Sequence, residues 1–134
     1  MPVLKYLADT NAVSDYFRPG NPVKAWFNDH PGEIGLSTLT LAEMRRGIEL
    51  KGDTKARLAL ERVFKFVLED YREAIFAFDE AAAAEWGRMM AQAKQPIPYD
   101  DSLIGAIARS RNLTVVTRNE KHFPGCDTVN PWKT

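Results

Sequence analysis

Acidic and amide side chains recur along this chain after strand-like segments or near the starts of the helices between them. Asp9 follows an apolar N-terminal run, and Glu43 lies in the helix expected after the second strand. Asp100 and Asp101 open a later helix, and Asn119 follows the most strand-like segment. Parallel strands bring their carboxyl ends to one edge of a sheet, where ligands bind in open α/β folds. These side chains are therefore expected to converge.

Converging carboxylates need a partner that offsets their charge. Two carboxylates about 4 Å apart repel each other by roughly 1 kcal/mol in bulk water and by about 4 kcal/mol at an effective dielectric constant of 20. A cation or a shared proton must remove this repulsion. The candidate ligands are oxygen atoms without a His or Cys cluster, which favours a hard ion such as Mg²⁺ or Mn²⁺. Such an ion activates water and stabilises charge on a phosphoryl group.

Each of these acids also has a local explanation. Asp9 is suited to cap the helix that follows it. Thr40 and Glu43 have the spacing of a capping box, in which the glutamate reaches back to the threonine amide. Asp100 and Asp101 are suited to the N-cap and the first turn of a helix, where the helix dipole favours acids. The local roles and the metal-binding role are compatible, and both stay open at this level.

Two other sets of residues are candidates for chemistry. Arg45 and Arg46 follow Glu43 closely and are suited to holding a phosphate, although a solvated helix face explains them nearly as well. His122 and Cys126 are close in sequence, but no second His or Asn is placed to assist them. This argues against a Cys–His nucleophile site.

The spacing of apolar residues and helix caps predicts strands that alternate with helices. Strands are expected at residues 3–7, 33–37, 74–78 and 113–117, with a short edge strand at 127–129. Helices are expected directly after Asp9 and at about residues 23–28, 41–50, 54–69, 80–94 and 100–111. The helix at 54–69 has a wide apolar face that is expected to lie in the core. This alternation predicts a parallel or mostly parallel sheet with helices on both faces.

The composition is that of a globular domain. The chain has 134 residues, of which 45% are hydrophobic and 27% charged, and we expect one domain over residues 1–134. Its 18 basic and 18 acidic side chains cancel, which argues against a protein that coats nucleic acid. No stretch is long and apolar enough to span a membrane, and no signal peptide is recognisable. The single cysteine, Cys126, suits the reducing cytoplasm.

Five sequence blocks then carry a resemblance to a known family. They are LADTNAVS (7–14), TLAEMRRG (40–47), DSLIGAIA (101–108), VVTRNEKHF (115–123) and VNPW (129–132). In this order the blocks resemble the PIN-domain ribonucleases, specifically the VapC/FitB-like toxins of type II toxin–antitoxin systems. Gly105 stands where that family usually has Ala.

The resemblance implies a fold and an activity. The fold would be a three-layer α/β/α sandwich around a central, mostly parallel sheet. The activity would be that of a Mg²⁺- or Mn²⁺-dependent endoribonuclease that hydrolyses RNA phosphodiester bonds. The protein would form a homodimer, and a cognate VapB-like antitoxin would inhibit it in a hetero-oligomer. DNA would be bound only indirectly, through the antitoxin.

The resemblance also implies roles for single residues. Asp9, Glu43 and Asp101 match the acidic triad: Asp9 and Asp101 would bind the metal directly, and Glu43 would complete its shell or orient the water. The supporting positions are Asn119 as a fourth catalytic residue, Thr10, Asn11 and Asp100 as polar neighbours, and Arg45, Arg46 or Arg118 as phosphate contacts.

Two alternatives to this activity remain. One is a catalytically weak module that binds its partner and acts in a DNA-bound toxin–antitoxin complex. The other is a phosphatase of the haloacid dehalogenase type, which also begins with a strand that ends in Asp. That class needs a second Asp two residues later, where this chain has Asn11, so we disfavour it.

Overall fold

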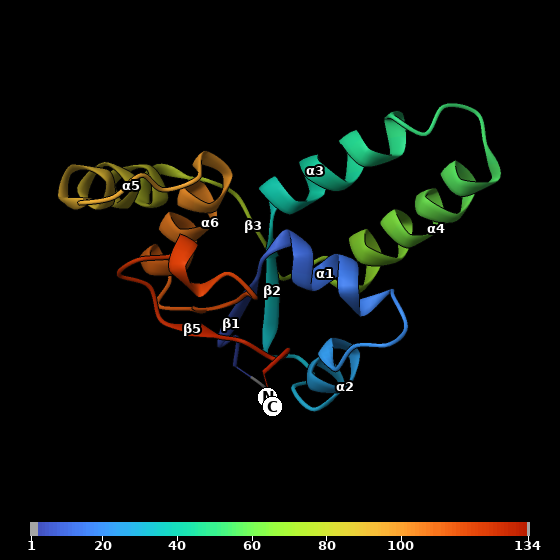
Figure 1. The fold of residues 1–134 in the computed structure, drawn as a ribbon, viewed down its shortest axis with the longest axis horizontal. Helices are drawn as coiled ribbons and strands as arrows, with labels where there is room; N and C mark the ends of the chain where they lie inside the picture. Colours follow the sequence, from blue (N-terminus) through green and yellow to red (C-terminus); the bar gives the residue numbers. More distant parts are fainter. Residues whose placement is uncertain (1–2, 134) are drawn as a thin grey trace.

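A computed structural model describes residues 3–133 and centres on one sheet of short strands (Figure 1). The strands are β1 (Tyr6–Ala8), β2 (Ile34–Ser37), β3 (Ile75–Phe76), β4 (Thr114–Val116) and β5 (Thr128–Val129). The sheet has the order β3-β2-β1-β4-β5, and the pairings between its neighbouring strands are parallel. The strands are shorter than expected, but the parallel sheet is confirmed.

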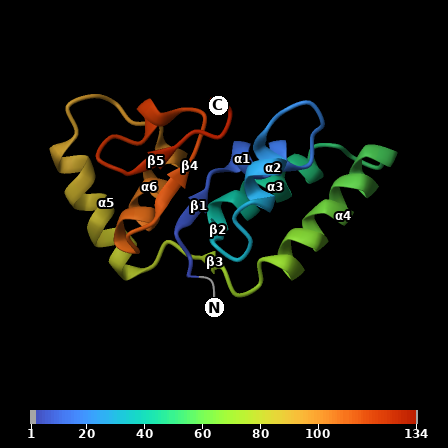
Figure 2. The same cartoon turned by 90° about the horizontal axis from the view of Figure 1, so that it is seen from below.

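Helices cover both faces of this sheet. Those in the described residues are α1 (Thr10–Tyr16), α2 (Val23–Asn28), α3 (Thr38–Glu49), α4 (Lys55–Asp70), α5 (Glu80–Gln92), α6 (Tyr99–Ser110) and the 3₁₀ helix η1 (Glu120–His122). Figure 2 shows α5 and α6 on one side and α1 to α4 on the other. Since successive strand residues face opposite sides, Ala8 and Val116 pack in one core cluster, and Leu7 and Val115 in the other. The structure is therefore an α/β/α sandwich.

The start of α3 differs from the expectation. The helix begins at Thr38 directly behind β2, and its N-cap is Ser37, whose hydroxyl accepts a hydrogen bond from the Thr40 amide at 3.2 Å. The predicted capping box of Thr40 and Glu43 is therefore wrong. The reason is that Ser37 both ends the strand and caps the helix that follows it. Glu43 is thereby left available for another role.

The start of α6 also differs. Its N-cap is Pro98, which makes no side-chain capping hydrogen bond, so the prediction that Asp100 caps this helix is wrong. Asp100 and Asp101 both lie in the first turn, where the helix dipole favours acidic side chains. The extended backbone of Pro98 (φ −53°, ψ 136°) marks the change from linker to helix.

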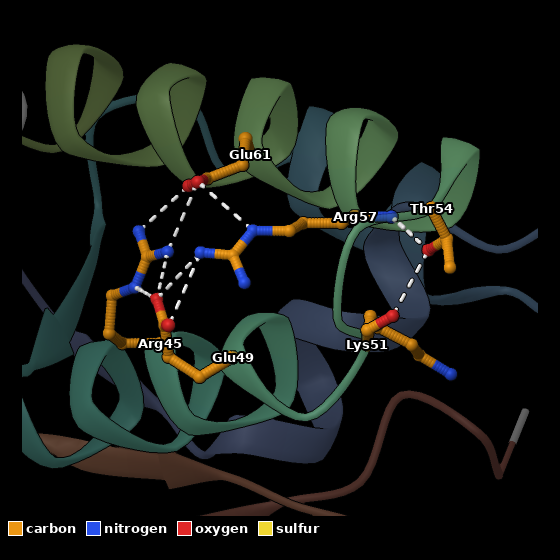
Figure 3. Close-up of polar contacts among 6 residues, drawn as sticks. All are labelled: Arg45, Glu49, Lys51, Thr54, Arg57 and Glu61. Carbon is orange, nitrogen blue, oxygen red and sulfur yellow. Dashed lines mark hydrogen bonds and ion pairs between the residues drawn. The ribbon is translucent and has the colours of Figure 1, made fainter.

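The α3–α4 hairpin extends away from the sheet (Figure 1). Arg45 and Arg57 pair with Glu49 and Glu61 between the two helices, with 2.7 Å from Arg45 to Glu61 and 3.1 Å from Arg57 to Glu49 (Figure 3). The apolar face of α4 that was expected in the core is only partly covered. Val67 is buried, whereas Leu58 is 61% exposed. The expectation of a buried α4 face is therefore confirmed at Val67, holds in part where Val63 packs against the core, and is wrong at Leu58 and Leu68.

The sequence predicts that no segment spans a membrane. Among residues 3–133, no helix combines the length and apolar character that a membrane crossing requires.

Candidate active site

A cavity of about 220 Å³ opens at the carboxyl edge of the sheet, where β1 ends. Its walls come from the start of α1, from α3 and from the start of α6, and they are formed by Asp9, Thr10, Asn11, Glu43, Pro98, Tyr99, Asp100 and Asp101. The acidic triad expected from the sequence thus lines one cavity. Its lining includes four carboxylates and no basic side chain.

Asp9 connects the sheet to this cavity. It caps α1 through a hydrogen bond that its Oδ1 accepts from the Ala12 amide at 2.9 Å, so the predicted capping role is confirmed. Its side chain is only 4% exposed. Burial, with smaller contributions from the nearby charges of Asp101 and Glu43, raises its pKa to about 6, although the hydrogen bonds from Thr117 and Ala12 act in the opposite direction.

Glu43 is oriented by two threonines. The Thr10 hydroxyl donates to Glu43 Oε1 at 2.8 Å, and the Thr40 hydroxyl lies 3.1 Å from that of Thr10. Burial raises the pKa of Glu43, and the charges of Asp100 and Asp101 act in the same direction. The Thr40 side chain therefore supports Glu43 through Thr10 rather than through a helix cap.

Asp101 is held by His122, a residue that the sequence alone suggested only as a partner of Cys126. His122 Nδ1 donates to Asp101 Oδ2 at 2.8 Å. Burial raises the pKa of Asp101, and His122 partly counteracts this effect. Nothing in the spacing of the sequence indicated this contact, because it depends on how η1 folds back against α6.

The donor set fits a hard divalent cation in its chemistry. The candidate ligands are carboxylate oxygens, and the pKa of each of the three acids is raised in part by the charge of a neighbouring carboxylate, so a cation would relieve repulsion that is already present. In the present conformation, however, no three Asp, Glu, His or Cys side chains of residues 3–133 lie close enough to share an ion. Asp9, Glu43 and Asp101 are each hydrogen-bonded to a different protein donor. They would have to turn toward one another to coordinate it.

The remaining polar candidates divide into two groups. Thr10, Asn11 and Asp100 lie in the cavity wall with the triad. Asn119 follows β4, and its backbone N–H donates to the Thr117 hydroxyl. Asn119 is not part of the cavity lining. A catalytic role for Asn119 stays a prediction.

The three candidate arginines also lie outside this lining. Arg45 pairs with Glu49 and Glu61, and Arg118 donates to the buried Asp15 at 2.7 Å. These partners hold both guanidinium groups in the present structure. Phosphate contacts by Arg45, Arg46 or Arg118 stay predictions.

Cys126 has a packing role. Its Sγ lies 3.8 Å from the Gly105 carbonyl, and a Cβ at Gly105 would lie only 3.2 Å from this sulfur. Burial raises the pKa of the thiol to about 11, so it stays protonated at neutral pH. This agrees with the rejection of a Cys–His nucleophile, and the sulfur fills the space that an alanine side chain at Gly105 would take.

Comparison with known proteins gives one consistent result. The PIN domain model matches residues 6–125. The chain is 35% identical to Toxin FitB of Neisseria gonorrhoeae, over 94% of this chain and 97% of that protein. It is 31% identical to the tRNA(fMet)-specific endonuclease VapC of Shigella flexneri, over 90% of this chain and 91% of that protein.

Solved structures agree with the sequence comparison. The crystal structure of FitAcB from Neisseria gonorrhoeae superimposes with a TM-score of 0.89 at 33% identity and covers 96% of this chain and 99% of that chain. DNA-bound VapBC from Salmonella typhimurium gives a TM-score of 0.77 at 26% identity, with coverage of 96% and 99%. The similarity therefore includes the segments that form the cavity.

Proposed function

Because this chain belongs to the PIN domain family, we propose that it is an endoribonuclease that acts as the toxin of a VapBC-like toxin–antitoxin pair. The observation that carries the proposal is the cavity lined by Asp9, Glu43 and Asp101 at the carboxyl edge of the sheet. A relative of almost the same length is named an endonuclease specific for tRNA(fMet).

We propose further that Asp9 and Asp101 bind Mg²⁺ or Mn²⁺ directly and that Glu43 completes the shell. The bound ion would supply an activated water and would stabilise the charge that develops on the phosphodiester. Burial and the α1 cap hold Asp9 in place at the end of β1. Thr10 orients Glu43, and His122 fixes one oxygen of Asp101, which leaves the other free for the cavity.

The proposed partners follow from the same relatives. A VapB-like antitoxin would hold the protein in an inactive hetero-oligomer, and DNA would be reached through that antitoxin. The similarity to DNA-bound VapBC supports this arrangement. We also propose that the chain is a single PIN domain, that it forms a homodimer, and that it acts on RNA in the cytoplasm.

The direct test uses purified protein without antitoxin, with a labelled RNA and a DNA of the same sequence. We expect cleavage of the RNA in Mg²⁺ or Mn²⁺ and intact RNA in EDTA. If the RNA stays intact under every metal condition while the protein still joins an antitoxin on DNA, the alternative of a catalytically weak binding module is correct.

Glu43→Gln separates the chemistry of the site from its stability. Glutamine keeps the oxygen that accepts from Thr10, and Glu43 makes no helix cap, so we expect the free energy of unfolding to stay within about 0.5 kcal/mol. Loss of one negative charge should lower metal-dependent cleavage at least tenfold. Urea unfolding and RNA cleavage rates measure the two effects. An unstable variant with full activity per folded molecule would contradict this role.

A further inference from the structure

An exposed aromatic ring stands beside the carboxylates of the cavity. Tyr99 is the first residue of α6, is 67% exposed, and lines the cavity together with Asp9 and Asp101. Leaving a large ring in water gains none of the stabilisation that burial would provide. Its packing in the fold therefore does not account for its presence at this edge.

The neighbouring residues hold Tyr99 in this position. The Trp86 indole N–H donates to the Ser102 hydroxyl at 2.9 Å, and that hydroxyl donates to the Tyr99 carbonyl at 2.6 Å. The Trp86 ring also meets the Tyr99 ring edge to face, with 6.4 Å between the centroids. Pro98 restricts the backbone directly before the ring. These contacts hold the backbone of Tyr99 and give its ring one aromatic neighbour before any ligand binds.

We propose that the Tyr99 ring stacks on a base of the RNA strand next to the scissile phosphate. A phosphodiester that reaches Asp9 and Asp101 brings its flanking nucleotide to the wall that Tyr99 forms. Unpaired RNA bases stack on aromatic side chains, and each stack contributes about 1–3 kcal/mol with little dependence on sequence. The exposed Tyr99 beside the carboxylates meets this requirement. The proposal rests on the nuclease function proposed above and adds a binding site for the base.

The test combines side-chain and nucleotide changes. A fluorescent single-stranded RNA of about eight nucleotides is titrated with the full chain in Ca²⁺, which offsets the charge of the carboxylates, and its anisotropy is recorded while a gel confirms that the RNA stays intact. We expect Tyr99→Leu to weaken binding about tenfold, and Tyr99→Phe to bind within twofold of the wild type because the ring is kept. Phe66→Leu, which changes an exposed ring on α4, is the matched control and should bind like the wild type.

Abasic nucleotides identify the stacked base. When the base is removed at each position in turn, one position should weaken wild-type binding about tenfold and leave Tyr99→Leu binding unchanged. Equal affinities of the wild type and Tyr99→Leu would overturn the proposal. It would also be overturned if no abasic position is coupled to Tyr99, or if Tyr99→Leu changes only self-association or antitoxin binding.

The two proposals fail in different ways. If the wild type binds RNA through Tyr99 but never cleaves it with Mg²⁺ or Mn²⁺, the nuclease function is contradicted and the stacking stands. If the wild type cleaves RNA and Tyr99→Leu binds it equally well, only the stacking is contradicted.

Discussion

Asp101→Asn is expected to abolish metal-dependent RNA cleavage, whereas Asp100→Ala should retain most of it. Successive residues of a helix point about 100° apart, so the two carboxylates cannot serve one ion equally well. Asp101 is hydrogen-bonded to His122, and its charge raises the pKa of Asp9. Asp100 lies in the same wall but is exposed. These contacts favour Asp101 as the ligand.

The comparison must be made at equal folded fraction. Asparagine keeps an acceptor for His122 and removes repulsion from Asp9, so Asp101→Asn should be at least as stable as the wild type without metal. Asp100→Ala loses only a first-turn acid, since Pro98 is the N-cap, and should cost less than about 1 kcal/mol. Cleavage rates over a range of Mn²⁺ concentrations provide the measurement. If Asp100→Ala is inactive and Asp101→Asn is active, Asp100 rather than Asp101 is the metal ligand.

Asp9→Asn is expected to make the metal-free protein more stable at neutral pH. The pKa of Asp9 rises from 3.8 to about 6 on folding, so the folded state binds more protons than the unfolded state between these values. The free energy of unfolding of the wild type therefore falls as the pH rises from about 4 to about 6. The full difference is about 3 kcal/mol, at 1.36 kcal/mol for each unit of pKa. Asparagine avoids this cost and still caps α1.

Urea unfolding in EDTA at pH 4 and pH 7 measures this effect. Relative to the wild type, we expect Asp9→Asn to gain stability between the two pH values, while its RNA cleavage is lost. The pKa values of Glu43 and Asp101 are also raised, so the difference between the two proteins isolates Asp9. If the free energies of unfolding of the two proteins change equally between pH 4 and pH 7, the pKa of Asp9 is not raised by folding and this prediction is contradicted.

The sequence predicted the location of the triad because this location depends on simple geometry. Asp9 ends β1, Glu43 lies on the helix that follows β2, and parallel pairing places both strand ends at one edge. Asp101 joins them through the start of α6. The α/β/α arrangement could also be predicted, because strands that alternate with helices form a parallel sheet with helices on both faces.

Contacts that depend on how separate segments pack could not be predicted. The bond from His122 to Asp101 requires the short η1 helix, and the bond from Trp86 to Ser102 requires the packing of α5 on α6. The cap of α3 could not be predicted because Ser37 is both the last residue of β2 and the N-cap of α3. Helical periodicity revealed the apolar face of α4, but it carries no information on whether the same chain covers that face.

The central claim is that Asp9, Glu43 and Asp101 bind the cation that drives RNA cleavage. Its most direct test is a Mn²⁺ titration of the antitoxin-free protein, in which bound Mn²⁺ is measured by electron paramagnetic resonance and RNA cleavage is measured in the same samples. We predict that occupancy and cleavage rise over the same concentration range, and that Asp101→Asn loses both. Full cleavage in excess EDTA, or unchanged Mn²⁺ occupancy in Asp101→Asn, would contradict the claim.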